Sequence, residues 1–395
     1  MIVALAVSAY LMLSRRVTTS TDWKATVTPL ASIMGSGFLV SAPLLAGAVG
    51  NLAIFCMAAL LVLAYFVGSA IRFNIQHFEP VENQHGPAQS VATLSRIVLV
   101  GAYFVSVSYY LQLLAAFVLH GVGIDDPTAA SWITTGVLVL ICGIGLWRGL
   151  GQLETVEKYA VSLNLGMIAA LLVGLAIYNL QLAFGGQWQL PELSSEIDLG
   201  DARIVLGLLI VVQGFETSRY LGSEHPAEQR IRTMRRAQLI SAGIYLPFLA
   251  LVTVLFQDGL QADVTAIVDM TRSVAMVLPI LLAVTAIVSQ FSAAVADVEG
   301  ASGLIENLSQ RRVTIRSSYV LILVVTIALT WQTDVNQIIA YASRAFALFY
   351  TLQCCVALMM VRQTKNLKRR GMLVGKFLLL AIVCAIVFIF GLPAE

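Results

Sequence analysis

Long apolar runs separated by short polar connections follow one another along almost the whole chain. A spanning helix needs about 20 apolar residues. The pattern predicts eleven spans, at about 27–49, 51–73, 93–119, 131–148, 158–181, 203–222, 236–256, 272–296, 316–332, 336–361 and 372–391. The apolar segment 1–13 is shorter than this, and the pattern leaves open whether it spans the membrane or lies at its surface.

Two of these runs carry glycine and polar residues near their middle. The first contains Gly35-Ser36-Gly37, and the second contains Gln213-Gly214-Phe215-Glu216. A spanning helix normally stays regular, because unpaired backbone groups are costly inside a bilayer. Interruptions at corresponding places in two halves of a chain are typical of a transporter site between inverted repeats. We therefore predict that helices one and six are discontinuous.

Charged residues alternate between the two sides of the predicted spans. With the segment before the first span inside, the inner connections hold most of the basic residues, including Arg15, Arg16, Arg96, Arg230–Arg236, Arg311, Arg312 and Arg362–Arg370. The outer connections are acidic, and Arg203 and Arg272 are their only basic residues. The positive-inside rule then places the N-terminal side of helix one in the cytoplasm, most simply at a bacterial inner membrane.

This topology predicts the organisation of the chain. Two units of five helices each must be inverted relative to each other, because an odd number of spans reverses direction. We expect an N-terminal segment and linker over 1–26, repeats over 27–181 and 182–363, and a peripheral eleventh helix over 364–395. The predicted fold class is an all-α, polytopic 5+5 inverted-repeat bundle.

Composition supports an integral membrane protein. The 395 residues are 58% hydrophobic and 12% charged, with a mean hydropathy of +0.86, whereas soluble proteins carry about 25% charged residues. No His-Glu-x-x-His or Ser-Lys signature of a membrane-embedded enzyme lies within the spans. The four histidines are dispersed without metal-ligand spacing. We expect no enzyme activity, cofactor, bound metal or nucleic-acid partner.

The two interruptions are the candidate substrate site. Freed amides at Gly35, Ser36 and Gly37 would begin a half-helix and could hold a carboxylate, although small residues also form packing faces. An acid at mid-span is a functional candidate. Glu216 could receive an ammonium group, tie the helix to a neighbour, carry a proton, or pair with Arg219.

Further polar residues inside the spans extend the candidate set. Tyr110 in the third span could line the cavity, and Phe215 could close over the site. Asp297 could serve an inner gate or a proton path. Arg344, in the tenth span, needs a partner, for which we expect an acid of the bundle in a gate ion pair, or an anionic substrate.

Three stretches resemble the amino acid–polyamine–organocation (APC) superfamily of transporters. The stretch from Pro29 to Pro43 resembles its first helix, and that from Gln213 to Arg236 resembles its sixth helix and the following loop. The stretch from Arg148 to Tyr159 resembles the lead-in to its fifth helix. The resemblance implies the leucine-transporter-type fold, alternating access, and an amino acid or amine as substrate.

The resemblance also implies roles for particular residues. It assigns the substrate carboxylate to Gly35, Ser36 and Gly37, and the amino group to backbone carbonyls at Gln213, Gly214 and Phe215. Where proton-coupled members often carry a lysine, this chain has Asn164. Sodium-coupled members use hydroxyl groups of the eighth helix, where Ser289 and Ser292 stand, but not as an adjacent pair.

The coupling ion, H⁺ or Na⁺, therefore stays open. We predict a secondary transporter of a small zwitterionic solute, embedded in the lipid bilayer. The alternatives are a cation-coupled carrier of another organic solute or an inorganic ion on the same fold, and a membrane sensor that does not transport.

Overall fold

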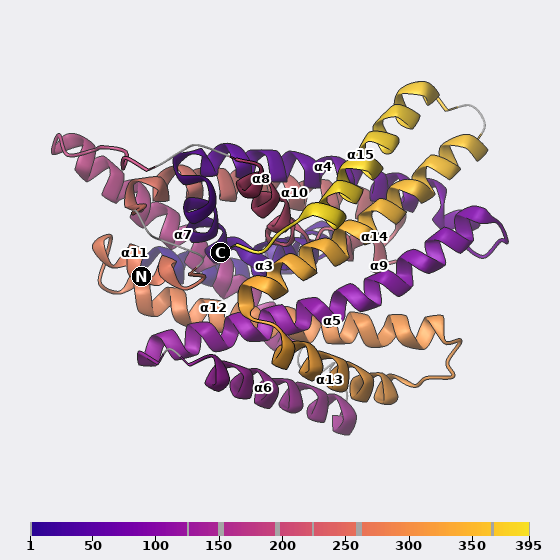
Figure 1. The fold of residues 1–395 in the computed structure, drawn as a ribbon, viewed down its shortest axis with the longest axis horizontal. Helices are drawn as coiled ribbons and strands as arrows, with labels where there is room; N and C mark the ends of the chain where they lie inside the picture. Colours follow the sequence, from indigo (N-terminus) through magenta and orange to yellow (C-terminus); the bar gives the residue numbers. More distant parts are fainter. Residues whose placement is uncertain are drawn as a thin grey trace.

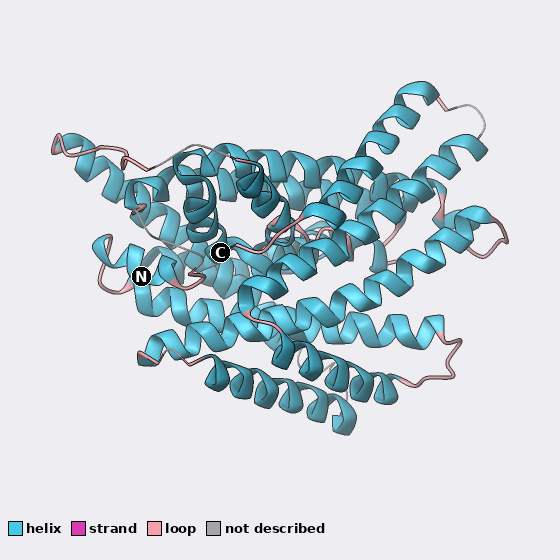
Figure 2. Cartoon of the chain, viewed as in Figure 1, coloured by secondary structure: helices cyan, strands magenta, loops and turns pink. Residues whose placement is uncertain are grey.

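The computed structural model describes residues 2–124, 126–148, 154–193, 198–222, 225–257, 263–364 and 367–394, without the side chains of Thr18, Ser36, Arg148 and 154–159. Throughout these ranges the regular structure is helical, and no strand occurs in them (Figure 2). The longer helices are α1 (Ile2–Leu13), α3 (Thr21–Val49), α4 (Ala53–His77), α5 (Pro87–Val122), α6 (Pro127–Arg148), α7 (Glu154–Phe184), α8 (Leu199–Gly207), α10 (Ala227–Val252), α12 (Leu278–Leu308), α13 (Ile315–Gln332), α14 (Val335–Gln363) and α15 (Arg370–Phe390). The short ones are α2 (Arg15–Thr18), η1 (Gly50–Leu52), η2 (Glu79–Val81), η4 (Leu209–Val212), α9 (Thr217–Tyr220), η5 (Thr253–Leu255), α11 (Ala266–Met270) and η6 (Thr271–Ser273).

The order of the predicted spans is confirmed, with two differences in continuity. Within the described ranges, nine uninterrupted helical runs are long and apolar enough to cross a membrane. The first, Thr21–His77, holds two predicted spans, α3 and α4, which meet at the single turn η1. The sixth predicted span is divided among α8, η4 and α9, so it is not one of the nine.

Polar residues of the connections begin several of these helices. Asp198 and Asp201 form a reciprocal capping box at the start of α8. The Asp334 side chain accepts hydrogen bonds from two backbone amides at the start of α14. Such caps satisfy amides that have no partner inside the helix. Acids that the sequence analysis placed in the outer connections thus also fix where helices start.

The long helix α5 runs through the middle of the bundle and packs against α12 and α14 (Figure 1). Its centre is buried and carries Tyr103, Tyr109, Tyr110 and Phe117. Helices α6 and α13 pack together beside it, and α15 lies along α14. Because α5 is covered on several sides, the polar side chains at its centre, Ser106, Ser108 and Gln112, are buried among other helices.

The N-terminal apolar segment forms the helix α1, which packs against α7. Its 12 residues would extend about 18 Å at the usual helical rise, less than the apolar thickness of a bilayer. A Cβ at Gly166 of α7 would lie 2.0 Å from the Ser8 hydroxyl oxygen. The structure thus shows α1 as an accessory helix that packs closely against α7 at Gly166.

Candidate functional site

The predicted break in the sixth span is confirmed. Helix η4 ends at Val212, Gln213 is extended, Gly214 has a φ of +116°, and α9 begins at Thr217. The Gly214 amide donates a hydrogen bond to the Glu216 carboxylate over 3.0 Å. The Thr217 hydroxyl donates to the Gly214 carbonyl over 2.8 Å. Local side chains therefore replace the helical hydrogen bonds that are lost at the break.

Glu216 holds the break to a neighbouring helix. Its carboxylate also accepts a hydrogen bond of 2.8 Å from the Tyr350 hydroxyl of α14, and the residue is 1% exposed. The Phe215 ring stacks on the same tyrosine at a centroid distance of 5.2 Å. Of the roles open to Glu216, these contacts support the tie to a neighbouring helix.

The predicted pairing of Glu216 with Arg219 is wrong, since the described residues contain no ion pair between them. The Arg219 guanidinium donates a hydrogen bond to the Gln353 side-chain oxygen and lies over the Phe78 ring. Gln353 also accepts from Asn74 and donates to Ser95. Arg219 thus belongs to a buried polar cluster of α4, α5, α9 and α14.

The predicted break in the first span is wrong as well, because α3 is one continuous helix from Thr21 to Val49. The Gly35 carbonyl accepts an additional hydrogen bond of 3.0 Å from the Gln290 amide of α12. A Cβ at Gly37 would lie 2.6 Å from the Val211 Cα. Glycine lowers the cost of leaving the helix but does not force it, and Gly37 here permits close packing.

The two predicted substrate-binding stretches nevertheless lie together. A Cβ at Gly214 would lie 2.5 Å from the Ser32 hydroxyl oxygen and 2.7 Å from the Ile33 nitrogen. The Tyr245 hydroxyl lies 3.1 Å from the Ile33 carbonyl and 2.5 Å from the Val211 carbonyl. In this conformation the backbones of α3 and the break pack directly on each other.

Polar groups around this contact are only partly satisfied. The Gln213 amide donates to the Tyr110 hydroxyl over 3.2 Å, which connects two predicted site residues. The side-chain oxygens of Gln213 and Gln290 are buried and find no hydrogen-bond partner in the described part of the chain. Unsatisfied buried acceptors are uncommon in proteins. A hydrogen-bond donor placed between α3, α5, η4 and α12 would therefore satisfy both oxygens.

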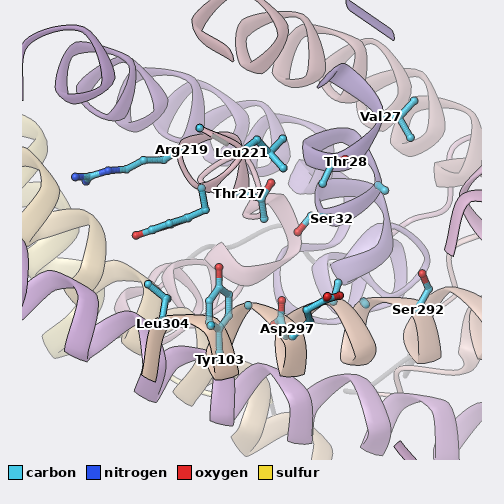
Figure 3. A pocket seen from close by; sticks show the side chains of 18 of the residues that line it. Val27, Thr28, Ser32, Tyr103, Thr217, Arg219, Leu221, Ser292, Asp297 and Leu304 are labelled. Carbon is cyan, nitrogen blue, oxygen red and sulfur yellow. The ribbon is translucent and has the colours of Figure 1, made fainter. Parts of the chain in front are cut away.

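A cavity of about 820 Å³ lies beside the break (Figure 3). Its lining includes five residues predicted for coupling or gating, namely Asn164, Ser289, Ser292, Arg219 and Asp297. Ser32 of α3 and Thr217 at the start of α9 also line it. The α12 wall has small side chains at Ser289, Ser292, Ala293, Ala296, Gly300 and Gly303. Their helical spacing leaves room along one face of α12.

Two contacts hold polar residues in position on this wall. The Asn164 amide of α7 donates to the Ser289 hydroxyl over 3.2 Å. The Ser106 hydroxyl of α5 donates to the Asp297 carboxylate. The predicted span ended just before Asp297. The residue is nevertheless buried, because α12 continues to Leu308.

Ion pairs gather at one end of the cavity. Arg230 of α10 and Glu79 of η2 form a pair at 2.6 Å, with a second hydrogen bond of 3.0 Å. Arg96 of α5 pairs with Glu82 at 3.1 Å. These four residues line the cavity; Glu79 and Glu82 lie between α4 and α5, and the side chains of Arg96 and Glu82 are 23% and 28% exposed. This end of the cavity is therefore its mouth.

Arg344 lies elsewhere. Its guanidinium donates a 2.8 Å hydrogen bond to the Phe388 carbonyl near the end of α15 and lies 6.0 Å from the ring of the same residue. No ion pair of Arg344 occurs within the described ranges, and it is not among the cavity-lining residues. The predicted gate ion pair is replaced by a contact between α14 and the peripheral helix.

Several residues that shape the site were not among those predicted from the sequence. Four side chains form hydrogen bonds to the break, to α3 or to Arg219, namely those of Tyr350 and Gln353 of α14, Tyr245 of α10 and Gln290 of α12. Each is a polar residue within an apolar run, which is the signal that could have selected them. That signal does not say which groups they contact.

Comparison with known proteins agrees with this geometry. A family model described as an APC superfamily transporter matches residues 15–391. The chain belongs to the APC superfamily of transporters. It is 41% identical over 384 residues to an uncharacterized protein of Aquifex aeolicus (strain VF5), covering 94% of this chain and 91% of that protein.

Solved structures show that this APC superfamily chain has the leucine-transporter-type fold. It resembles MhsT in complex with L-phenylalanine, with a TM-score of 0.60 and 14% identity, covering 93% of this chain and 98% of that one. It resembles a manganese transporter of Eremococcus coleocola with a TM-score of 0.60 and 13% identity, covering 93% and 86%. At such low identity the likeness concerns the fold. The chain is a transporter rather than an enzyme.

Proposed function

We propose that this transporter is a secondary active carrier of an amino acid or a related small amine, and that it works by alternating access. The observation that carries the proposal is the cavity between α3, the helix α9 that follows the break, and the polar face of α12. Its wall offers hydroxyl groups, the Asn164 amide and the Asp297 carboxylate. Such groups can orient a small organic solute by hydrogen bonds.

The position of the cavity mouth supports an inward-open state, in which the cavity opens toward the cytoplasm. Glu79, Arg96 and Arg230 lie at the end of the bundle that the distribution of basic residues places in the cytoplasm. In the opposite state, the two five-helix repeats, 27–181 and 182–363, would exchange the open end for a closed one.

An amino acid is the favoured solute for two reasons. MhsT, which shares the fold, was solved in complex with L-phenylalanine. The cavity also combines apolar residues such as Val27, Val161 and Leu304 with the polar α12 face. The fold alone does not exclude an inorganic ion, since a manganese transporter shares it.

A ligand screen followed by a flux assay tests the proposal. Thermal unfolding of the detergent-purified protein is measured with amino acids, amines and organic acids, each with and without sodium, because a ligand of the native state raises the unfolding temperature. Stabilising compounds are then assayed for uptake into proteoliposomes. We expect amino acids or amines to stabilise the protein and to be taken up; a compound that stabilises but is never transported would indicate a sensor.

A pair of tryptophan variants tests the location of the path. Ala293→Trp fills the α12 side of the cavity and should abolish uptake. Leu140→Trp, on α6 at a position 54% exposed, should leave uptake close to that of the wild type. Equal uptake by both variants would show that this cavity is not the path.

A further inference from the structure

We infer that Arg203 and Arg344 are positioning residues of the transport cycle, which hold α8, the outer part of the divided sixth span, in its closed position. They do so through residues 388–392, the α15 end, to which both arginines bond. The inference rests on the proposed alternating access. It gives a role to two arginines of the predicted spans that are not among the cavity-lining residues.

Arg344 holds the α15 end to α14. Its Nε donates a 2.8 Å hydrogen bond to the Phe388 carbonyl, and its guanidinium lies 6.0 Å from the centre of the Phe388 ring. Carbonyls in the last turn of a helix have no partner within that helix, and the helix dipole favours a cation beside them. Arg344 thus acts as a cap for α15 that is supplied by a different helix.

Arg203 holds the same segment to α8. Its Nε donates a 3.1 Å hydrogen bond to the Phe390 carbonyl, and its own carbonyl accepts one of 3.0 Å from the Leu392 amide. A Cβ at Gly207 would overlap the Leu392 carbonyl, so glycine permits this close approach. Arg203 and Gly207 stand one helical turn apart on the same face of α8. The α15 end therefore lies along that face (Figure 1).

Helix α14 also holds the segment that follows α8. The Ser343 hydroxyl oxygen accepts a 2.8 Å hydrogen bond from the Ile210 amide of η4, and Ser343 directly precedes Arg344. Two consecutive residues of α14 thus fix η4 and the α15 end. Helix α8 lies between these attachments and ends at Gly207. A rotation of α8 away from α14 must therefore break its bonds to the α15 end.

Alternating access requires such a movement on the outer side. The cavity opens on the inner side, and α8 follows a connection that the charges place outside. Because α15 packs against α14 far more extensively than against α8, we expect the α15 end to stay with α14. The bonds of Arg203 then break when the outer side opens. Loss of either arginine should favour the outward-open state.

Two reporter cysteines, each introduced after replacement of the five native cysteines, follow the two sides. Ser41→Cys is at a buried position of α3, one turn from Gly37 and on the face that meets Val211. Ala293→Cys lines the inner cavity. Their reaction with impermeant methanethiosulfonates is timed in intact cells for the first and in inside-out vesicles for the second. A cationic and an anionic reagent are both used, since replacing an arginine changes the local charge.

Arg203→Met and Arg344→Met keep the length of the side chain and remove its donors. We expect each to raise the outer rate of Ser41→Cys by about tenfold with both reagents, because a hydrogen bond to a charged group is lost. Each should also lower the inner rate of Ala293→Cys. Lys376→Gln, near the opposite end of α15, should change neither rate.

A rise at both reporters, or no change at either, would overturn the positioning roles, because a loosened fold exposes both sides and an idle contact exposes neither. A rise at the outer reporter alone would keep the hold on α8 and contradict alternating access. Reciprocal changes in a protein that takes up no compound would contradict the carrier function and leave the positioning roles standing. Uptake by the wild type without reciprocal changes in the variants would contradict the positioning roles alone.

A double variant and a glycine substitution test whether the arginines act through one segment. In Arg203→Met with Arg344→Met, the change in log rate should be smaller than the sum of the two single changes, because both bonds belong to one connection between α8 and α14. Gly207→Ala displaces the Leu392 carbonyl and keeps both arginines, so it should raise the outer rate as Arg203→Met does. Full additivity, or a wild-type outer rate in Gly207→Ala, would show that the α15 end does not hold α8.

Discussion

The segments around Gly35 and around Gly214 share glycine and polar neighbours within an apolar run, yet only the second leaves the helix. At Gly214 the backbone has a φ of +116°, and Glu216 and Thr217 bond to the freed backbone groups. At Gly35 the helix continues, and Gln290 merely adds a second donor to a carbonyl. A break in an apolar environment thus needs partners for its backbone groups as well as a residue that tolerates the turn.

The largest expected effect is the difference in stability between alanine substitutions at Gly214 and at Gly35. Gly214→Ala should lower the free energy of unfolding by about 2–6 kcal/mol, because a positive φ and contact with the α3 backbone are both unfavourable. Gly35→Ala should change it by less than about 1 kcal/mol, because the helix preference of alanine offsets the small shift that the Ser289 side chain must make, its oxygen lying 3.3 Å from the new Cβ. Thermal unfolding in detergent measures both.

If Gly214→Ala cannot be purified, its yield relative to Gly35→Ala gives the same comparison. Equal stability of the two variants would contradict the difference in conformation between the two segments.

A double-mutant cycle tests whether Glu216 holds the break to α14. Glu216→Ala and Tyr350→Phe should show a coupling energy of about 1–3 kcal/mol, because they share a buried hydrogen bond to a charged group. The matched cycle of Glu216→Ala with Arg219→Ala should give less than about 0.5 kcal/mol, because these side chains do not pair. Larger coupling to Arg219 than to Tyr350 would indicate that Glu216 pairs with Arg219 instead.

Gly37 should behave differently from Gly35, although only one residue separates them. Gly37→Ala should lower the free energy of unfolding by about 1–3 kcal/mol, because its Cβ would overlap the Val211 backbone. Thermal unfolding beside Gly35→Ala measures the difference. Tolerance of alanine at both positions would show that α3 and η4 pack less closely than the structure has them.

The smallest effect concerns the extra donor at α3. Gln290→Leu should speed amide hydrogen exchange within 36–40 by about threefold, because the Gly35 carbonyl loses a bond of about 1 kcal/mol. The peptide covering 213–217 should exchange as in the wild type, and faster than 36–40 in both proteins. Exchange in 36–40 as fast as in 213–217 in the wild type would indicate that α3 is also broken.

The difference between the two segments also explains which predictions the sequence could support. Apolar runs predicted the spans because length and hydropathy are local properties, and Gln213–Glu216 carries in Glu216 a side chain that bonds to the freed Gly214 amide. The continuity of α3 was not predictable, because the Gly35–Gly37 stretch shows only that unwinding is permitted. The partner of Arg344 could not be foreseen either, since the Phe388 carbonyl belongs to a helix 44 residues away.

The candidate cavity illustrates the same limit. Asn164, Ser289, Ser292 and Asp297 were selected separately, as polar residues or by resemblance, and the structure brings them to one cavity. Their joint use depends on α3, α5, α7, α9 and α12 meeting there. The spacing of small residues along α12 was visible in the chain, but the helix it would face was not.

By itself the sequence determined that this protein is helical, lies in a membrane, and interrupts its sixth span, because apolar length and a helix-breaking glycine act locally. Tertiary structure alone decided that the first span stays intact, that Glu216 ties the break to Tyr350, and that Asp297 faces the cavity. Those outcomes depend on which neighbouring helix supplies a hydrogen-bond partner, and local propensity contains no information about that neighbour.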